Sequence, residues 1–380
     1  MTYTIITPCH FGSESVLNYE IKKIGGEDIQ VSDGQITFTG DERTIVKANI
    51  HLRTAERVLI LLKKFEARTF DELFDGIYSI NWKQLLPRDC EFPVKGSSLS
   101  STLSSVPACQ KIVKKAIVEK LRKQYSVREL PETGALYKLR FSIRKDTVSM
   151  MMDTSGDGLH KRGYRREAGE APIKETLAAT IVDLARIYDD NTIQDPFCGS
   201  GTLLIEAAQR AANIAPGLKR HFIAEHYSFI PKSLWEEEKE AARKEIKTDI
   251  AFKAYGFDID PMVLETARKN AEKRGVSKYI SFHVRDVRKF SPQKDSIIIT
   301  NPPYGERLGD HEEAVKLEKT LMNRLKDSDI RSAYVITSDS DFEANTRRKA
   351  DRRRKLYNGM IPCQLYMYFR KKRDTTKGQV

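Results

Sequence analysis

Residues 301–308 of this chain are NPPYGERL, and they follow a short apolar run, DSIIIT, at residues 295–300. An aliphatic run with polar ends predicts a buried strand. Proline cannot donate a hydrogen bond to a neighbouring strand, so this strand must end at Asn301. Its carboxyl end then displays Asn301, two backbone carbonyls and the ring of Tyr304, at the edge where open α/β sheets bind ligands. These groups suit a stacked ring that carries an amino group. NPP alone equally fits a proline turn capped by Asn, so the assignment depends on the rest of the chain.

The composition favours a globular protein with a polyanionic partner. Of 380 residues, 40% are hydrophobic, enough for one large core or two to three smaller ones. The formal net charge of +12 favours nucleic acid over an anionic membrane. No apolar run approaches the roughly 18 residues that span a bilayer, and the start lacks the features of a signal peptide. The five cysteines never show CxxC spacing, which predicts reduced thiols in a cytoplasmic protein and no metal site.

The first 155 residues predict a small α+β layer of alternating short strands and helices, ferredoxin-like or similar. The expected order is a strand (2–7), a helix (14–24), a hairpin strand (31–41), a strand (45–52), a helix (55–64), one or two helices (69–90), a strand entering a Ser/Gly-rich loop (92–105), a helix (108–125) and two strands (136–143 and 148–153).

Three basic segments are candidates for contact with phosphate groups. They are one face of the helix 108–125, the glycine-rich segment 156–167 and the run 347–355. A solvated face or a linker is the ordinary interpretation of each, but a serine-rich loop before the helix and a nearby strand-end site favour a nucleic-acid surface. The candidate residues are Lys111, Lys114, Lys115, Lys161, Arg162, Arg165, Arg347, Arg348, Arg352 and Arg353.

A glycine loop follows the first predicted strand of the second region. Residues 192–195 (TIQD) predict a strand, 196–202 (PFCGSGT) a loop and 203–212 a helix. Glycines let the backbone approach a ligand closely and direct helix N–H groups towards it. The loop lacks both the GxGxxG pattern of dinucleotide sites and the GK[ST] of a Walker loop. Asp195 before the turn would repel phosphates and suits a ligand with a positive centre.

Two further strand ends carry acidic residues. The strand 252–257 ends at Asp258, whose carboxylate can accept both hydroxyls of a ribose, whereas Asp260 predicts a helix cap. The strand 280–284 is followed by Asp286, which can meet the amino group of an adenine. The remaining expected elements are a helix (171–184), an insertion (213–250) ending in a charged helix (235–247), a helix (312–326), a strand (332–337) and an antiparallel pair (355–357 and 364–370).

The order of these features along the chain is specific. Four successive strand ends with polar residues, the first followed by a glycine loop, resemble class I S-adenosylmethionine-dependent methyltransferases, and NPPY resembles their amino-methylating branch. Bacterial THUMP-containing guanine-N2 RNA methyltransferases, in particular the type that modifies 23S rRNA, are similar over nearly the whole chain. The motifs that carry this resemblance are GLHKRGYR (158–165), DPFCGSGTLLIEAA (195–208), GFDIDPMVLETARKNA (256–271), NPPYGERLG (301–309) and LYNGMIPCQLY (356–366).

The resemblance implies an α/β fold: a Rossmann-like class I methyltransferase sheet with an antiparallel last strand, preceded by a ferredoxin-like and THUMP RNA-binding region. The expected boundaries are a ferredoxin-like segment (1–45), a THUMP domain (46–155), a basic linker (156–170) and a methyltransferase domain (171–380). The implied cofactor is S-adenosylmethionine and the implied partner is RNA, with rRNA favoured over tRNA and no obligate protein partner. The implied cofactor-binding residues are Asp195, Phe197, Gly199, Gly201, Thr202, Asp258, Ile259, Asp286, Val287 and Asn301. The implied catalytic residues are Asn301, Pro302, Pro303 and Tyr304.

The expected reaction is methylation of the exocyclic N2 of a guanine. The hypothesis is that Asn301 Oδ1 and the Pro302 carbonyl accept the two N–H groups of the amine, while Tyr304 stacks on an unstacked base. The alternatives are tRNA guanine-N2 methylation, N6-adenine methylation and a catalytically inactive RNA-binding scaffold.

Overall fold

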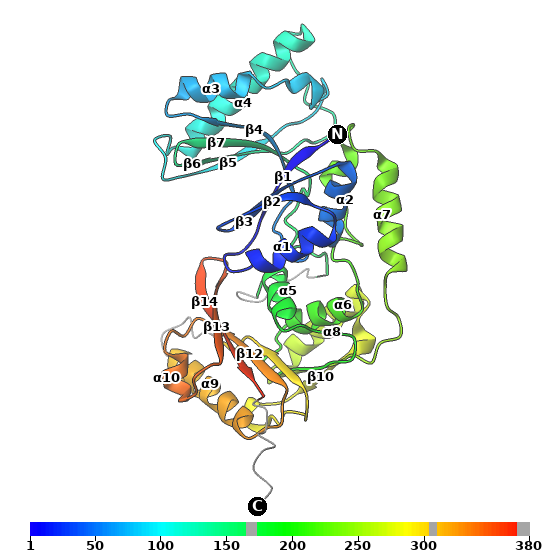
Figure 1. The fold of residues 1–380 in the computed structure, drawn as a ribbon, viewed down its shortest axis with the longest axis vertical. Helices are drawn as coiled ribbons and strands as arrows, with labels where there is room; N and C mark the ends of the chain where they lie inside the picture. Colours follow the sequence, from blue (N-terminus) through cyan, green and yellow to red (C-terminus); the bar gives the residue numbers. More distant parts are fainter. Residues whose placement is uncertain (165–172, 304–309, 371–380) are drawn as a thin grey trace, which may run out of the picture. The chain divides into compact units, whose positions relative to one another are not determined.

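The structure, a computed structural model, describes residues 1–164, 173–303 and 310–370 (Figure 1). The described residues divide into two units. The first unit contains residues 1–9, 17–159 and 217–241, and the second contains the described parts of 10–16, 160–216 and 242–380. Each unit is built on a mixed seven-stranded sheet with helices against it. No helix among the described residues is long and apolar enough to cross a membrane.

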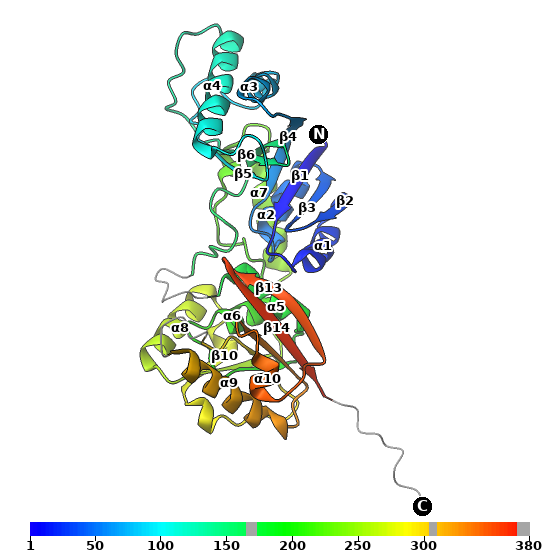
Figure 2. The ribbon, with the colours of Figure 1, turned by 90° about the vertical axis from the view of Figure 1, so that its left-hand side faces the viewer.

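The sheet of the first unit has the strand order β2-β3-β1-β4-β7-β6-β5. Its pairings are antiparallel except that of β5 with β6. The strands are β1 (Tyr3–Pro8), β2 (Glu27–Ser32), β3 (Gln35–Gly40), β4 (Leu59–Glu66), β5 (Val94–Leu99), β6 (Leu139–Arg144) and β7 (Thr147–Asp153). The helices of this part of the chain are α1 (Glu14–Lys23), α2 (Glu42–His51), α3 (Phe70–Tyr78) and α4 (Val106–Tyr125), with a 3-10 turn at Trp82–Gln84. α3 packs on α4, and α4 lies against β5 (Figure 2).

Two elements of this unit differ from the prediction. The predicted strand over residues 45–52 is the helix α2, and the predicted helix over residues 55–64 is the strand β4. α2 begins after Asp41, whose carboxylate accepts a hydrogen bond from the Thr44 N–H at 2.8 Å. β4 lies between β1 and β7 in the middle of the sheet. A short apolar run of this kind does not distinguish a central strand from a buried helix.

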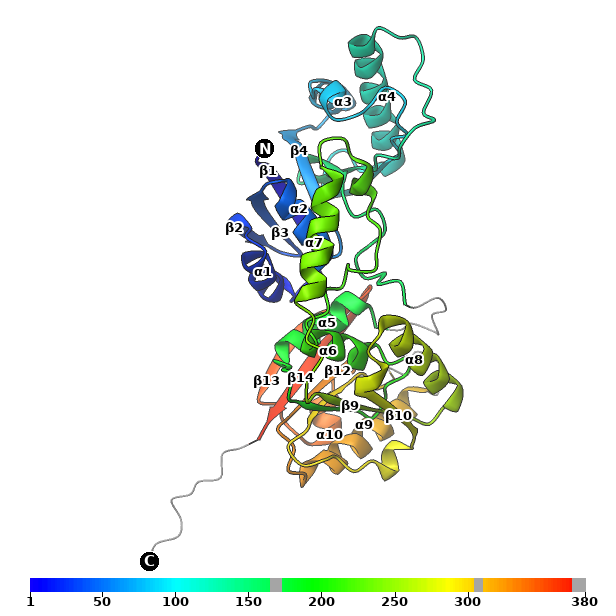
Figure 3. The same ribbon diagram turned by 90° about the vertical axis from the view of Figure 1, so that its right-hand side faces the viewer.

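Residues 217–241, predicted as part of an insertion in the second region, belong to the first unit. The N–H of Gly217 donates to the Ile50 carbonyl at 2.8 Å. Helix α7 (Lys232–Lys244), which corresponds to the charged helix predicted over 235–247, is joined to α2 by ion pairs of Arg43 with Glu237 and Glu238. Figure 3 shows α7 alongside α2. The first unit therefore includes a segment that follows the glycine loop in sequence.

The sheet of the second unit has the order β10-β9-β8-β11-β12-β14-β13. The first five strands in this order are parallel, and β14 is antiparallel to both β12 and β13. The strands are β8 (Thr192–Asp195), β9 (Lys253–Asp258), β10 (Ile280–Val284), β11 (Ile297–Thr300), β12 (Ser332–Thr337), β13 (Arg352–Asn358) and β14 (Ile361–Phe369). One face is covered by α5 (Glu175–Leu184), α6 (Thr202–Ala211) and α8 (Pro261–Arg274), and the other by α9 (Asp310–Lys326) and α10 (Phe342–Thr346).

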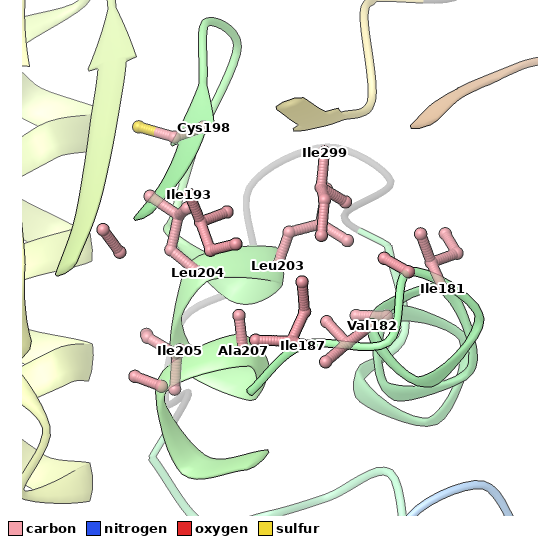
Figure 4. Close-up of a cluster of buried hydrophobic side chains, with 14 of the residues drawn as sticks. Ile181, Val182, Ile187, Ile193, Cys198, Leu203, Leu204, Ile205, Ala207 and Ile299 are labelled. Carbon is pink, nitrogen blue, oxygen red and sulfur yellow. The ribbon is translucent and has the colours of Figure 1, made fainter. Parts of the chain in front are cut away.

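The core of this unit fixes the strand that precedes the glycine loop. Leu203 and Leu204 in the first turn of α6 lie among Ile193 of β8 and Ile299 of β11 (Figure 4). Each of these side chains is at most 3% exposed. A Cβ added at Gly256 of β9 would lie 2.7–2.9 Å from the side chains of Phe282, Leu204 and Cys198, so this strand carries no side chain there. The loop and its helix are therefore positioned by close packing on β8 and β9.

We predict that the N-cap of α2 contributes measurably to stability. Replacing Asp41 by Ala removes the side-chain acceptor of the Thr44 N–H and should lower the free energy of unfolding by about 1 kcal/mol. Urea unfolding of the full chain measures the change. The matched control is Ser105→Ala at the N-cap of α4, because the Ser105 side chain makes no capping hydrogen bond. Equal effects of the two substitutions would contradict the assigned cap.

Candidate active site

The carboxyl ends of β8 and β11 meet at the point where the strand order of the second sheet reverses. β8 is the first strand of this sheet in the chain and β11 the fourth, yet they are neighbours. Ligands of open α/β sheets bind at this switch point. The two strand ends are joined directly, because the Thr300 hydroxyl donates to Asp195 Oδ1 at 2.6 Å. Asn301 follows Thr300 and thus lies beside the glycine loop that follows Asp195.

Asp195 is enclosed and does not face solvent. Its residue is 1% exposed, and its Oδ1 also accepts the N–H of Phe197 at 3.0 Å. Burial raises the pKa of Asp195 to about 7, and the Thr300 and Phe197 hydrogen bonds oppose that rise. The contact of this carboxylate with a positive ligand stays a prediction; the two hydrogen bonds to Asp195 join the start of the glycine loop to the end of β11.

The glycine loop places no side-chain cap at the N-terminus of α6. Gly199 and Gly201 have φ values of +50° and +80°, which L side chains rarely adopt. Gly201 is the N-cap residue of α6 and provides no capping side chain, while Thr202 in the first turn is buried. A Cβ at Gly199 would meet nothing within 4 Å. The first N–H groups of α6 and the open space at Gly199 suit a ligand that approaches the backbone closely.

Asp258 joins the end of β9 to the glycine loop. Its Oδ2 accepts the Gly199 N–H at 3.0 Å, and its Oδ1 accepts the Asp260 N–H at 3.0 Å. A carboxylate offers about four acceptor positions, so both oxygens can still accept a hydroxyl. Asp260 itself caps α8 by accepting the Met262 N–H at 2.8 Å, as predicted.

Exposed apolar side chains flank Asp258. Ile259 is 65% exposed, and Met262 and Val284 are also exposed. Ile259 follows the end of β9, Met262 lies in the first turn of α8 and Val284 ends β10. A flat aromatic ring would cover such side chains, since exposed aliphatic groups at a site favour apolar contact.

Asp286 is engaged locally. It caps the 3-10 turn Val287–Lys289 and forms an ion pair with Arg288 at 2.8 Å. The hydrogen bond from the Arg288 side chain holds the pKa of Asp286 below its usual value. Val287 is buried, and Phe197 packs against the core cluster that contains Val287. A contact of Asp286 with an adenine amino group stays a prediction, and such a contact has to share the carboxylate with Arg288.

Asn301 has a buried side-chain acceptor at the end of β11. Its side-chain Oδ1 is buried and has no hydrogen-bond partner among the described residues. A buried amide oxygen normally has a donor, because an unsatisfied one costs about 1–3 kcal/mol. Pro302 is buried and Pro303 is exposed. Tyr304 lies outside the described residues.

Glu318 on α9 is a buried acid that the sequence analysis missed. It is 2% exposed, and its Oε1 accepts the Thr337 hydroxyl, at the end of β12, at 2.6 Å. Burial raises the pKa of Glu318 to about 8, against the effect of the Thr337 hydrogen bond, and Asp339 raises it further. The sequence does contain a signal for a buried acid at this position, because Glu318 is the polar member of an otherwise apolar helix stripe that contains Ala314 and Leu321.

The basic candidates divide into exposed and engaged residues. On α4, Lys111 and Lys115 are exposed along a depression of about 610 Å³, whereas Lys114 lies 3.3 Å from the Phe92 ring centroid and 2.8 Å from Glu132. Lys161 is exposed. Arg162 corrects a prediction: it is 2% exposed and pairs with buried Glu206 at 3.4 Å, so it is not on an RNA surface. Arg165 lies outside the described residues.

Most of the run 347–355 lies away from the strand-end site, contrary to the expectation. The Arg348 carbonyl accepts from the Tyr368 hydroxyl, and Tyr368 pairs with Ala333 near the start of β12. Arg348 also stacks on the Tyr368 ring at 4.8 Å. Arg347 and Arg352 are exposed, and Arg353 pairs with Glu343 at 3.3 Å.

This combination of sheet and site defines a class I methyltransferase. The strand order, with a parallel core and the antiparallel β14 inserted before the edge, positions a glycine loop, a carboxylate and an amide oxygen on one edge. S-adenosylmethionine fits the residues present: the N-terminus of α6, which has no side-chain cap, can face a carboxylate, Asp258 a ribose and Ile259 an adenine ring.

Comparisons with known proteins agree with this class. Residues 162–367 match the RMKL-like methyltransferase domain, 4–59 the RlmL ferredoxin-like domain and 67–153 the THUMP domain. The chain belongs to the family of the RMKL-like methyltransferase domain. YpsC of Bacillus subtilis, named as a candidate RNA methyltransferase, is 42% identical over 99% of this chain and 98% of its own length.

Two further similarities extend the comparison. A ribosomal RNA large subunit methyltransferase K/L of Shewanella baltica is 32% identical over 94% of this chain, which spans about half (52%) of that protein. The crystal structure of SMU.472, named as a candidate methyltransferase, with S-adenosylhomocysteine has a TM-score of 0.92 and 38% identity, covering 98% of this chain and 99% of that chain.

We predict that Asp195 makes stability depend on pH. Its pKa of about 7 exceeds the ordinary value of 3.8, so the folded protein binds the proton more tightly than the unfolded chain. The stabilisation that this proton gives the folded state is fully present below about pH 4 and is lost as pH rises through about 7. Its upper bound is on the order of 4 kcal/mol. In Asp195→Asn the fall in unfolding free energy between pH 5 and 7 should be smaller than in wild type, measured by urea unfolding.

A matched variant separates this effect from that of the second buried acid. Glu318→Gln should also flatten the curve between pH 5 and 7 and, unlike Asp195→Asn, should flatten it between pH 7 and 8 as well, because the pKa of Glu318 is about 8. If Asp195→Asn and wild type lost stability in parallel from pH 5 to 7, the assigned protonation of Asp195 would be wrong.

Proposed function

We propose that this chain is an S-adenosylmethionine-dependent RNA methyltransferase that methylates the exocyclic N2 of a guanine in 23S rRNA. The observation that carries the proposal is the buried Oδ1 of Asn301 at the switch point of the sheet, for which the described part of the chain provides no donor. An acceptor held there without a donor suits a substrate N–H group. The name of the K/L relative supports ribosomal RNA as the substrate, and the THUMP match supports RNA.

The chemistry required of the chain is mostly positioning. The lone pair of guanine N2 is delocalised into the ring, so the amine is a weak nucleophile. Bound S-adenosylmethionine supplies an electrophilic methyl group on a sulfonium. Asn301 Oδ1 and the Pro302 carbonyl accept the two N–H bonds, which favours tetrahedral nitrogen and directs its lone pair. Orientation of this kind accounts for much of the barrier reduction in a two-substrate reaction.

The remaining residues hold the partners of the reaction in place. Asp258 binds the ribose hydroxyls while it orders the glycine loop through the Gly199 N–H. Asp195 keeps Thr300, and with it Asn301, beside that loop. The exposed Ile259 and Val284 cover an adenine ring and exclude water from it. The guanine leaves its stack to reach Asn301, as in other enzymes that modify a base.

The test is methylation of fractionated RNA. The full chain is incubated with unmodified 23S rRNA, 16S rRNA or tRNA and labelled S-adenosylmethionine, and the RNA is digested to nucleosides. Label in N2-methylguanosine from 23S rRNA is the expected result. Label from tRNA would overturn the rRNA assignment, label in N6-methyladenosine would overturn the target amine, and no label in any RNA would overturn the activity.

We predict that Asn301→Ala lowers turnover with little change in binding. The substitution removes one acceptor of the target amine but leaves Asp195, Asp258 and the glycine loop intact. The rate constant kcat should fall by about 10²-fold or more, by analogy with loss of one transition-state hydrogen bond. Equilibrium affinities for S-adenosylhomocysteine and RNA should stay near those of wild type. A variant that turned over at the wild-type rate would remove Asn301 from the mechanism.

We predict that Asp258→Ala weakens cofactor binding by about tenfold or more. Each lost hydrogen bond to a charged group contributes roughly 1.5–3 kcal/mol. Calorimetric titration with S-adenosylhomocysteine measures the loss. The control is Asp260→Ala, which removes only the cap of α8 and should reduce stability by about 1 kcal/mol while affinity is kept. Equal loss of affinity in both variants would contradict the ribose assignment.

A further inference from the structure

The β13–β14 hairpin extends beyond the catalytic edge of the sheet. Thr337, the last residue of β12, pairs with Gln364, which in turn pairs with Lys355. The hairpin continues past this level through the pair Asn358 and Ile361, a projection of about 10 Å at 3.4 Å per residue. β13 lies three strands from β11, about 14 Å across the sheet at 4.8 Å per strand.

The projecting hairpin carries an exposed apolar side chain, Met360, and a half-buried ring, Tyr357. Met360 at its turn is 94% exposed. Tyr357 lies two residues before the turn glycine, Gly359, and its ring centroid is 5.8 Å from that of Phe11, which is 50% exposed. We call Phe11, Tyr357 and Met360 the tip platform.

The segment that carries Phe11 is held in place against β13. A Cβ at Gly12 would lie 2.3 Å from the Lys355 carbonyl oxygen, so only glycine allows this approach. The Gly12 N–H donates to Glu14 at 2.8 Å, and Arg354 donates to the Ser15 hydroxyl at 2.9 Å. The exposure of Phe11 is therefore a fixed feature and not that of a loose side chain.

The platform combines ring faces with positive charge. Lys355 Nζ lies 5.5 Å from the Tyr357 ring centroid, and Arg354 lies on the same strand. Rings stack on any nucleobase, Met and Phe side chains insert next to bases, and neighbouring cations hold the phosphates. Exposed Tyr188, by contrast, precedes β8 and lies at the opposite edge of the sheet.

We propose that the tip platform stacks on an unpaired base of the RNA strand near the target guanine. The inference rests on the proposed function, because it takes RNA to be the substrate at Asn301. About 14 Å across the sheet and about 10 Å beyond its edge combine to about 17 Å, which corresponds to about five nucleotides at about 3.4 Å each along a stacked strand. The platform holds the flanking strand after the guanine has left its stack, and so it acts in RNA binding.

The test uses three single alanine variants of the full chain, at Phe11, Tyr357 and Met360, with in vitro transcribed 23S rRNA as the probe. Each variant should raise the KM for RNA about five- to tenfold, and the dependence of RNA affinity on salt should keep its wild-type slope because no charge is removed. Met360 is almost fully exposed, so Met360→Ala gives a readout free of folding defects. Phe11→Tyr should restore the wild-type KM if stacking is the cause.

The control is Tyr188→Ala, an exposed aromatic at the other edge, which should leave the KM for RNA unchanged. Wild-type KM values in the three platform variants would overturn the inference while the methyltransferase assignment stands, and would leave the platform as a surface for a protein. Equal damage from Tyr188→Ala would also overturn it. If the wild type methylates tRNA instead, the same comparison is made with tRNA. If it methylates no RNA, the proposed function fails, and this inference fails with it.

Discussion

The hydrogen bond from the Thr300 hydroxyl to Asp195 is the constraint on which the site depends. It ties the carboxyl end of β8 to that of β11 across the switch point of the sheet. The same oxygen accepts the Phe197 N–H, so one buried atom fixes both the start of the glycine loop and the residue before Asn301. Loss of either donor would remove one of the two hydrogen bonds to this buried oxygen, about 0.5–1.5 kcal/mol of stability. The amine acceptor and the cofactor loop therefore share one frame.

A second threonine–acid contact brackets β11 on its other side. The Thr337 hydroxyl at the end of β12 donates to Glu318, as Thr300 does to Asp195, and each bond is 2.6 Å long. Burial is the largest cause of the raised pKa in both acids. The neutral acids stabilise the fold because they avoid a buried charge, and ionisation weakens the edge from both sides. Buried acids close to a strand-end site are typical of active sites, where stability is given up for function.

The sequence predicted the second unit well and the first unit less well. Strands 192–195, 280–284 and 332–337 have their predicted bounds, because turn residues and polar strand ends mark them locally. The strand at β4, the burial of Arg162 against Glu206 and the placement of 217–241 all depend on partners distant in sequence, whereas the Asp41 cap that begins α2 is a local signal that the prediction missed. A local sequence pattern reflects residues a few positions apart. These three outcomes are decided by packing between residues that lie 40 or more positions apart in the chain.

Exposed apolar side chains lie on both sides of the switch point at this edge of the second sheet. Ile259 and Val284 lie on the β9–β10 side of the switch point, whereas Met360 lies on the hairpin at the other side. Exposed aliphatic and aromatic surface lowers solubility and favours association, so a fold tolerates it where a ligand covers it. On the β9–β10 side of the edge, the Asp258 carboxylate can accept hydroxyls. On the hairpin side, Lys355 can bind phosphate. Asn301 lies between the two halves, where a methyl donor on one side and a nucleic-acid strand on the other bring their reacting atoms together.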